Sequence, residues 1–151
     1  MDGLAIQISD VPVAWHPMST QRLFEREGSP ELRFSFYERR PELPVIHNGE
    51  FRFLPWGNKT DAARVPKGGW CELEELEAGR WQWLKPQEVV IPANYGRQSG
   101  RWFLIDSAAR GILVHDEHGH PYVYMLTEPA SHYYEIMCRH QRMPVLIDQR
   151  I

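Results

Sequence analysis

The chain has 151 residues, a length typical of one folded domain of roughly 100–150 residues. Hydrophobic residues make up 42% of the sequence and charged residues 25%, which excludes a largely disordered chain and predicts a packed core. The net charge of −3 excludes nucleic-acid binding through bulk positive charge, but it leaves room for a local basic patch.

The first expected elements are a helix and a strand. Residues 18–20 can cap a helix whose apolar side includes Leu23 and Phe24 and which ends at Gly28. Residues 31–38 alternate between apolar and polar side chains, and this period of two predicts a half-buried strand.

A hairpin is the clearest local signal in the sequence. Asn48 and Gly49 separate two β-rich runs, residues 44–47 and 50–54, and both turn positions of a type I′ hairpin require a positive φ angle. The polar, turn-rich residues 58–69 then predict a long surface loop.

The middle of the chain predicts a short acidic helix over residues 71–78, ended by Gly79. Four strands are expected after it, and the short turns between the last three favour antiparallel pairing. These strands cover residues 88–92, 101–106, 110–115 and 122–127.

The C-terminal part predicts a helix followed by a last strand over residues 143–147. Thr127 or Glu128 would cap this helix, and its apolar side would be formed by Tyr133, Ile136 and Met137. The whole chain, residues 1–151, is thus expected to form a single α+β domain with a mainly antiparallel sheet and two or three short helices.

The sequence contains no export or membrane signal. No apolar run approaches roughly 18 residues, and the first ten residues lack both a basic start and an apolar core. Cys71 and Cys138 are too few for a disulfide framework. We therefore expect a cytoplasmic protein with reduced thiols and no membrane partner, and the sequence leaves the oligomeric state open.

Two constellations could carry metal or thiol chemistry. His115, His118 and His120 lie among carboxylates, but their spacing matches no closed zinc motif, so we expect a polar turn and neither a metal nor a cofactor. Cys138 and His140 are two residues apart, which puts them on different faces of a helix. A structural thiol is therefore the better interpretation of Cys138.

Arginine and aromatic residues are interleaved in several segments, such as Arg101-Trp102. Such pairs can hold phosphates and stack on the bases of a single strand, or they can place the aromatic ring in the core and the arginine in water. We expect at least one exposed indole among four tryptophans, namely Trp56, Trp70, Trp81 and Trp83.

The segment 139–147, Arg-His-Gln-Arg-Met-Pro-Val-Leu-Ile, resembles the His-Asp-Arg-Met-Pro-Val-Ile-Leu motif of the SOS-response-associated peptidase (SRAP) family. Weaker matches precede it in the family's order, at residues 44–46, 56–57, 91–94 and 126–130. The resemblance covers residues 44–147, whereas residues 1–43 carry little of it.

The resemblance implies a mixed α+β fold built on a curved sheet, which binds single-stranded DNA and captures abasic sites. In the family, an N-terminal cysteine closes a thiazolidine ring on the sugar aldehyde through its amine and its thiol. An asparagine, a glutamate and a histidine assist, and the same cysteine is credited with removing a short leader.

The family's functional residues are only partly present. His140 matches the family histidine, a general acid or base, and Arg142 matches the neighbouring arginine, a partner for phosphate or carboxylate. Gln98 falls near the family glutamate, and Asp2 stands where the family has its cysteine. No asparagine occurs near residues 68–70, where the family asparagine would fall.

Asp2 supplies no thiol, so the stable ring cannot form, although a terminal amine can still form a reversible imine with an aldehyde. The resemblance therefore predicts a SRAP-like domain that binds single-stranded or abasic DNA without a covalent bond, in the context of DNA damage. Its groove would be lined by His140 and by three DNA-contacting residues, Trp56, Asn94 and Arg142.

Two alternatives remain open. One is an active enzyme of the family, either crosslinking DNA or cleaving itself, that uses another nucleophile such as the Met1 amine or Cys71. It requires an acid or base partner within about 4 Å of His140, or one that reaches it through a single bridging water. The other is a protein-binding scaffold of phage or bacterial origin. A positive cleft with an exposed tryptophan would favour DNA, and a neutral or acidic cleft would favour the scaffold.

Overall fold

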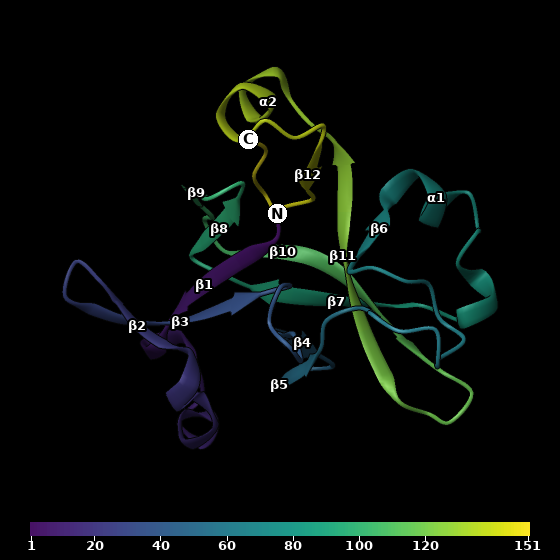
Figure 1. The fold of residues 1–151 in the computed structure, drawn as a ribbon, viewed down its shortest axis with the longest axis horizontal. Coiled ribbons are helices and arrows are strands. Elements are labelled where there is room, and N and C mark those ends of the chain that lie inside the picture. Colours follow the sequence, from purple (N-terminus) through teal and green to yellow (C-terminus); the bar gives the residue numbers. More distant parts are fainter.

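A computed structural model describes residues 1–151 and consists of two β-sheets packed face to face, with short helices around them (Figure 1). The smaller sheet has five antiparallel strands in the order β2-β3-β1-β8-β9 and lies on the left in Figure 1. Its strands are β1 (Gly3–Gln7), β2 (Leu23–Arg26), β3 (Ser29–Ser35), β8 (Tyr95–Gln98) and β9 (Arg101–Leu104).

The larger sheet has seven strands, six of them in the order β12-β11-β10-β7-β4-β5. The seventh, β6, runs parallel to β11, and all other pairs are antiparallel. Its strands are β4 (Glu42–His47), β5 (Glu50–Pro55), β6 (Trp70–Glu72), β7 (Gln87–Pro92), β10 (Ala108–His115), β11 (Pro121–Pro129) and β12 (Arg142–Pro144).

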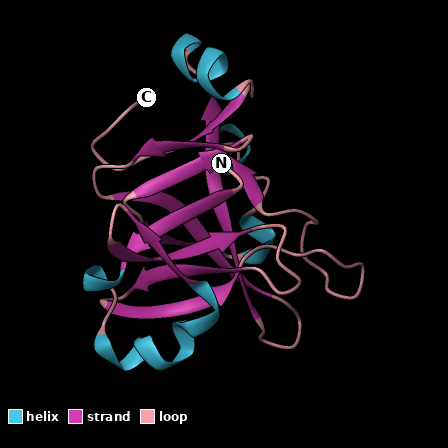
Figure 2. Ribbon diagram, turned by 60° about the vertical axis from the view of Figure 1, so that its left-hand side comes forward, coloured by secondary structure: helices cyan, strands magenta, loops and turns pink.

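The helices are short and lie at the periphery of the strands (Figure 2). Two are α-helices, α1 (Leu73–Glu77) and α2 (His132–Cys138), and the others are 3-10 helices over Ile8–Asp10, Val13–Arg22 and Gln82–Leu84. No helix is long and apolar enough to cross a lipid bilayer.

The main core lies between the two sheets and contains 24 buried residues, among them Leu4 and Phe34 from one sheet and Ile91 and Met125 from the other. A second cluster of eight buried residues, including Trp81 and Tyr124, fills the opposite face of β10 and β11. The larger sheet is thus covered on both faces, whereas the smaller sheet has the core on one face only.

The expected fold class is confirmed, because the chain is a single α+β domain dominated by antiparallel strands. The expected hairpin is confirmed as β4 and β5, and its turn residues Asn48 and Gly49 have φ angles of 51° and 77°. The strands expected over residues 88–92 and 110–115 correspond to β7 and β10.

The helix expected after residues 18–20 is wrong. Val13–Arg22 forms a 3-10 helix, and Leu23 and Phe24 then belong to strand β2, which pairs with β3. Two adjacent apolar residues fit either a helix or a strand, and here pairing with a neighbouring strand decides the conformation.

The expected order of strands in the second half is also partly wrong. Strand β9 pairs with β8 in the smaller sheet, so the turn before Ala108 carries the chain from one sheet to the other. Strands β1 and β8 were not expected from the sequence. β1 has four consecutive buried residues and therefore lacks the alternation that marks a half-buried strand.

The two expected α-helices need correction at their ends and faces. Cys71 lies in β6, so α1 begins only at Leu73. Ser131 caps α2 by accepting a hydrogen bond from the Tyr134 amide, and this helix buries Tyr134 and Cys138. Of the three residues expected on its apolar side, Tyr133 and Ile136 are exposed, whereas Met137 is partly buried against the core.

Candidate functional site

A hollow of about 390 Å³ lies where the start of β1, the end of β8 and the connection between α2 and β12 meet. Four of the six predicted site residues line it, namely Asp2, Gln98, His140 and Arg142. Its other lining residues are Met1, Tyr37, Trp70, Glu72 and Thr127. The fold therefore brings together side chains from both ends of the chain.

The N-terminus is held in this hollow by backbone contacts. The Asp2 amide donates to the Arg97 carbonyl at 2.9 Å, which extends the pairing of β1 with β8. The Trp70 indole Nε1 donates to the Met1 carbonyl, also at 2.9 Å. The side chain of Met1 is buried, so the first residue is part of the core rather than a free end.

The amino group of Met1 is the most perturbed base in the hollow. Burial lowers its pKa from 8.0 to about 6, although the negative charge of Asp2 acts in the opposite direction. It makes no hydrogen bond within the chain. At neutral pH this amine is mostly unprotonated, and its lone pair is available to attack a carbonyl carbon.

The His140 side chain is held by contacts with the backbone of Arg142. Its Nδ1 lies 2.9 Å from the Arg142 carbonyl oxygen and 3.2 Å from the Arg142 amide nitrogen. The carboxylates of Asp2 and Glu72 line the same hollow as His140, but neither forms an ion pair with its imidazole. The active-enzyme alternative therefore has no directly paired acid or base at this histidine.

Arg142 is engaged in an ion pair within the chain. Its guanidinium donates to both oxygens of Glu74 at 2.7 and 3.1 Å and to the Thr127 carbonyl at 2.9 Å. The hydrogen bond with Glu74 raises the pKa of Arg142 and lowers the pKa of the Glu74 carboxyl. Arg142 therefore connects α1 to β11 and offers few free donors to a phosphate.

Gln98 forms the inner wall of the hollow. It is buried, and its Oε1 lies 3.5 Å from the Tyr134 hydroxyl, which can donate a weak hydrogen bond. Burial raises the pKa of Tyr134 and that of Cys138, so both stay protonated at neutral pH. Cys138 is accordingly a structural thiol in this site, as expected from the sequence.

The other predicted residues lie elsewhere. Trp56 does not line the hollow, because its side chain is buried in the core and its Nε1 donates to the Gly69 carbonyl at 2.9 Å. Asn94 fixes the end of β1 by accepting from the Gln7 amide and donating to Asp10. Cys71 is buried, and burial followed by nearby glutamates raises its pKa to about 12. These positions exclude Trp56 as a base-stacking residue and Cys71 as a nucleophile.

Sequence reasoning missed Trp70, Tyr37 and Thr127 as lining residues. The expectation of at least one exposed indole among Trp56, Trp70, Trp81 and Trp83 is confirmed by Trp83, which is 64% exposed, whereas Trp70 is half-buried in the hollow. No local signal marks Trp70 or Thr127, because the long-range parallel pairing of β6 with β11 places them at the hollow.

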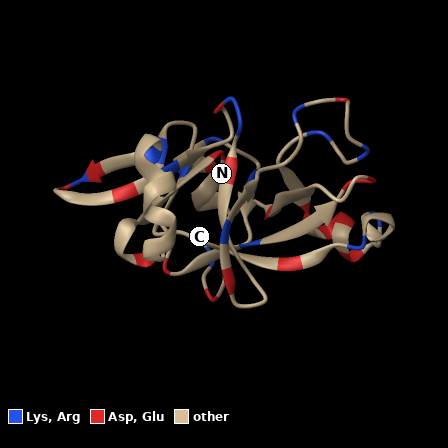
Figure 3. Ribbon diagram, turned by 90° about the horizontal axis from the view of Figure 1, so that it is seen from below, with Lys and Arg blue, Asp and Glu red and all other residues tan.

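The hollow itself carries no positive excess. Asp2, Glu72 and the paired Arg142 are the charged side chains that line it. Three exposed arginines lie one to three residues from its lining residues and form no ion pair, namely Arg97, Arg101 and Arg139. Acidic and basic residues are scattered over the whole ribbon in Figure 3. The acidic lining alone would suit the protein-binding alternative, whereas the neighbouring arginines suit phosphates.

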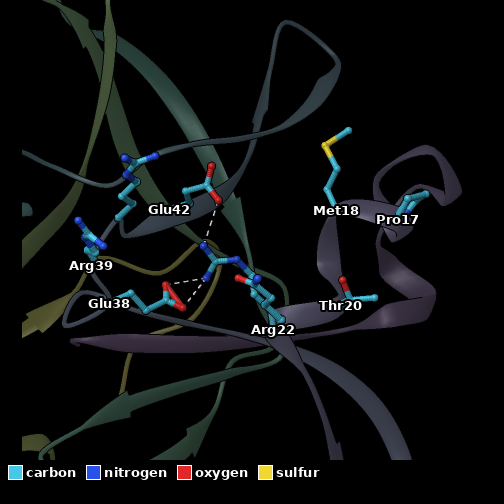
Figure 4. A pocket seen from close by; sticks show the side chains of 9 residues that line it. Pro17, Met18, Thr20, Arg22, Glu38, Arg39 and Glu42 are labelled. Atoms are coloured by element: carbon cyan, nitrogen blue, oxygen red, sulfur yellow. Dashed lines mark hydrogen bonds and ion pairs between the residues drawn. The ribbon is translucent and has the colours of Figure 1, made fainter.

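A second hollow and the histidine-rich turn are less suited to bind a ligand. A hollow beside the Val13–Arg22 helix contains Arg22, but Glu38 and Glu42 hold this guanidinium at 2.6 and 3.0 Å (Figure 4). The histidine-rich segment is a turn in which Asp116 accepts from the amides of His118 and His120. No group of three or more His, Cys, Asp or Glu side chains is placed to hold a metal ion.

No protein-family model matches the chain, and no curated protein matches it significantly. Its fold is similar to that of a protein from Bacteroides thetaiotaomicron that was solved by X-ray crystallography in a structural genomics programme, with a TM-score of 0.55 and 12% sequence identity. The similar region covers 78% of this chain and 63% of that protein, so this chain spans less than two thirds of its length. A likeness at this identity concerns the fold alone, and membership of the SRAP family stays a hypothesis that rests on the sequence motifs.

Proposed function

We propose that the chain is a SRAP-like cytoplasmic domain that binds single-stranded DNA at abasic sites without a stable covalent bond. The observation that supports this proposal most is the convergence of Asp2, Gln98, His140 and Arg142 in one hollow. The motif resemblance alone marks these residues, and they come from three distant parts of the sequence, at Asp2, at Gln98 and at His140 with Arg142.

The charge distribution suits an abasic nucleotide better than a normal one. The sugar left after loss of a base is uncharged, so it can enter an acidic hollow of about 390 Å³. The phosphates on either side would contact two exposed arginines close in sequence to the lining residues, Arg101 and Arg139. A DNA strand would thus place its charge outside the hollow and its lesion inside.

We expect the purified protein to retard a single-stranded oligonucleotide with one abasic site on a native gel, and the complex to dissociate on a denaturing gel. His140→Ala is expected to weaken the complex about tenfold through the loss of one polar contact to the ligand. His132→Ala is the matched control, because His132 is an exposed histidine of α2 outside the hollow.

Two results would contradict this proposal. An adduct that survives denaturation without a reducing agent would mean that the covalent chemistry is retained. A native gel without any retardation at low salt, where phosphate contacts are strongest, would favour the protein-binding scaffold.

A second candidate function is the reversible capture of an aldehyde by the Met1 amine. The observation that favours it is the buried amine without a hydrogen-bond partner, whose pKa is about 6. In this reaction the amine nitrogen attacks the aldehyde carbon, and loss of water leaves an imine that water can hydrolyse again. Because no thiol follows at Asp2, no ring closes.

Sodium cyanoborohydride should reduce this imine to a stable secondary amine between the protein and the abasic oligonucleotide. The yield should rise between pH 5 and about pH 7, because an amine with a pKa of about 6 loses its proton there. An ordinary terminal amine would instead react mainly above roughly pH 8. A trapped product that peptide mapping assigns to lysine, or that acetylation of Met1 leaves unchanged, would exclude this candidate.

A further inference from the structure

The smaller sheet leaves one of its faces without a covering layer. Its inner face, which includes Leu4, Leu32 and Phe34, packs on the core. The register places a set of arginines and aromatic residues on the outer face, because Arg97 lies opposite Gly3 and Trp102, and Tyr95 and Arg33 both lie opposite Ala5. We call this set the arginine–aromatic face; it consists of Phe24, Arg26, Arg33, Tyr95, Arg97 and Trp102.

The guanidinium groups and the aromatic rings of this face are stacked on one another. The Arg26 guanidinium carbon lies 4.0 Å from the Tyr95 ring centroid and 4.5 Å from the Trp102 centroid. Arg33 lies 4.7 Å from the Phe24 ring and Arg97 lies 5.6 Å from the Trp102 ring. These cation–π contacts fix the long side chains in layers, so a ligand that adds another planar group meets a surface that is already ordered.

The charge of this face is positive, in contrast to the whole chain. The buried Glu31 carboxylate pairs with both Arg26 and Arg33 at 2.8 Å. Arg97 is exposed and forms no ion pair. Three arginines against one glutamate leave an excess of positive charge, which suits an anionic ligand and disfavours a cationic one.

We propose that the arginine–aromatic face binds single-stranded nucleic acid, with Arg97 on the phosphates and Phe24 and Trp102 stacked on bases. Phe24 is 47% exposed, so the side of its ring that faces away from Arg33 can stack on a base. Positive charge combined with aromatic stacking is the arrangement by which proteins hold single strands without sequence preference. A five-stranded sheet is about 19 Å wide at the usual strand spacing, which is enough for roughly four nucleotides of a single strand.

The face and the hollow are formed by neighbouring residues of the same strands. Arg97 belongs to the face, while the next residue, Gln98, lines the hollow, and Gly3 and Asp2 are related in the same way on β1. Because successive residues of a strand point to opposite faces of the sheet, the two surfaces are separate, and the face can hold the undamaged part of a DNA strand independently of the hollow. This inference rests on the proposed function for the class of ligand, but it assigns a separate surface to the undamaged part of the strand.

Fluorescence anisotropy with a labelled oligothymidylate of about a dozen nucleotides, several times the expected site size, tests this inference. Arg97→Glu is expected to weaken binding at least tenfold. Arg97→Ala should reduce, by about 0.7, the slope of the logarithm of the association constant against the logarithm of the salt concentration. Trp102→Phe should weaken binding several-fold while it keeps an aromatic ring for Arg26. Arg80→Glu is the matched control, because Arg80 is an exposed arginine outside both surfaces.

Variants of the hollow separate this inference from the proposed function. If Gln98→Ala and His140→Ala weaken binding but the Arg97 and Trp102 variants do not, the inference is wrong and the proposed function stands. If only the Arg97 and Trp102 variants weaken binding of both intact and abasic strands, the inference stands and the proposed function fails. Equal competition by a poly-glutamate peptide of the same length, or no binding by the wild type at low salt, would overturn the inference.

Discussion

Trp56→Ala is expected to lower the free energy of unfolding by about 3–5 kcal/mol, the usual cost of removing a large aromatic side chain from a core. Only 1% of Trp56 is exposed, and its ring packs against Phe36 and Trp70 with centroids 5.4 and 5.9 Å apart. The substitution also leaves the Gly69 carbonyl without its indole donor. Urea unfolding followed by circular dichroism would measure the change without relying on tryptophan fluorescence.

Trp83→Ala is the matched control for this prediction. Its indole is 64% exposed, so its removal is expected to change the free energy of unfolding by less than about 0.5 kcal/mol. A Trp56→Ala protein that is as stable as the wild type but has lost DNA binding would show instead that this indole contacts the ligand, as the sequence motif suggested.

Glu31→Ala is expected to lower the free energy of unfolding by about 2–4 kcal/mol, because it leaves two neighbouring guanidiniums without their counter-ion. Only 2% of the Glu31 side chain is exposed, whereas Arg26 and Arg33 keep partial access to water, which reduces the cost. Glu25→Ala is the control, since Glu25 is an exposed residue of the same hairpin that forms no ion pair. Chemical unfolding of both variants at neutral pH would measure the difference, and equal stabilities would contradict the prediction.

The same carboxylate should make the stability depend on pH. Burial alone would raise the pKa of Glu31, but hydrogen bonds and attraction from Arg26 and Arg33 outweigh burial and lower it. A lowered pKa means that this contribution is present above the pKa of an unfolded glutamate, about 4.3, and is lost as the pH falls through the folded value. The stability difference between wild type and Glu31→Gln should therefore shrink in acid.

Local signals in the sequence were sufficient for part of the fold. The β4–β5 hairpin was predictable because Asn48 and Gly49 determine the turn by themselves. The strand β1 was not, because its neighbours β3 and β8 come from remote segments and its residues show no alternation. Helix α2 was predicted, but its buried face was predicted only at Met137, since tertiary packing buries Tyr134 and Cys138 and leaves Tyr133 and Ile136 exposed.

The site was predictable only where a motif marked it. Asp2, Gln98, His140 and Arg142 were selected by resemblance, and they share one hollow. Trp56 was misplaced because a motif shows which residue is present but not whether its side chain is buried. The engagement of Arg142 by Glu74 could not be foreseen, because the two residues are 68 positions apart and meet only in the folded chain.

The central position of β1 has a consequence for how the chain is made. The bond between the Gln7 amide and Asn94 joins residues 87 positions apart, so the first strand completes its sheet only after β8 has been synthesised. At a rate of synthesis of about 5–20 residues per second, one edge of the nascent strand β1 stays unpaired for roughly 5–20 seconds. Such long-range pairing slows folding and exposes an apolar edge to other chains. The ribosome-bound protein should therefore depend on chaperones until about two thirds of the chain has emerged.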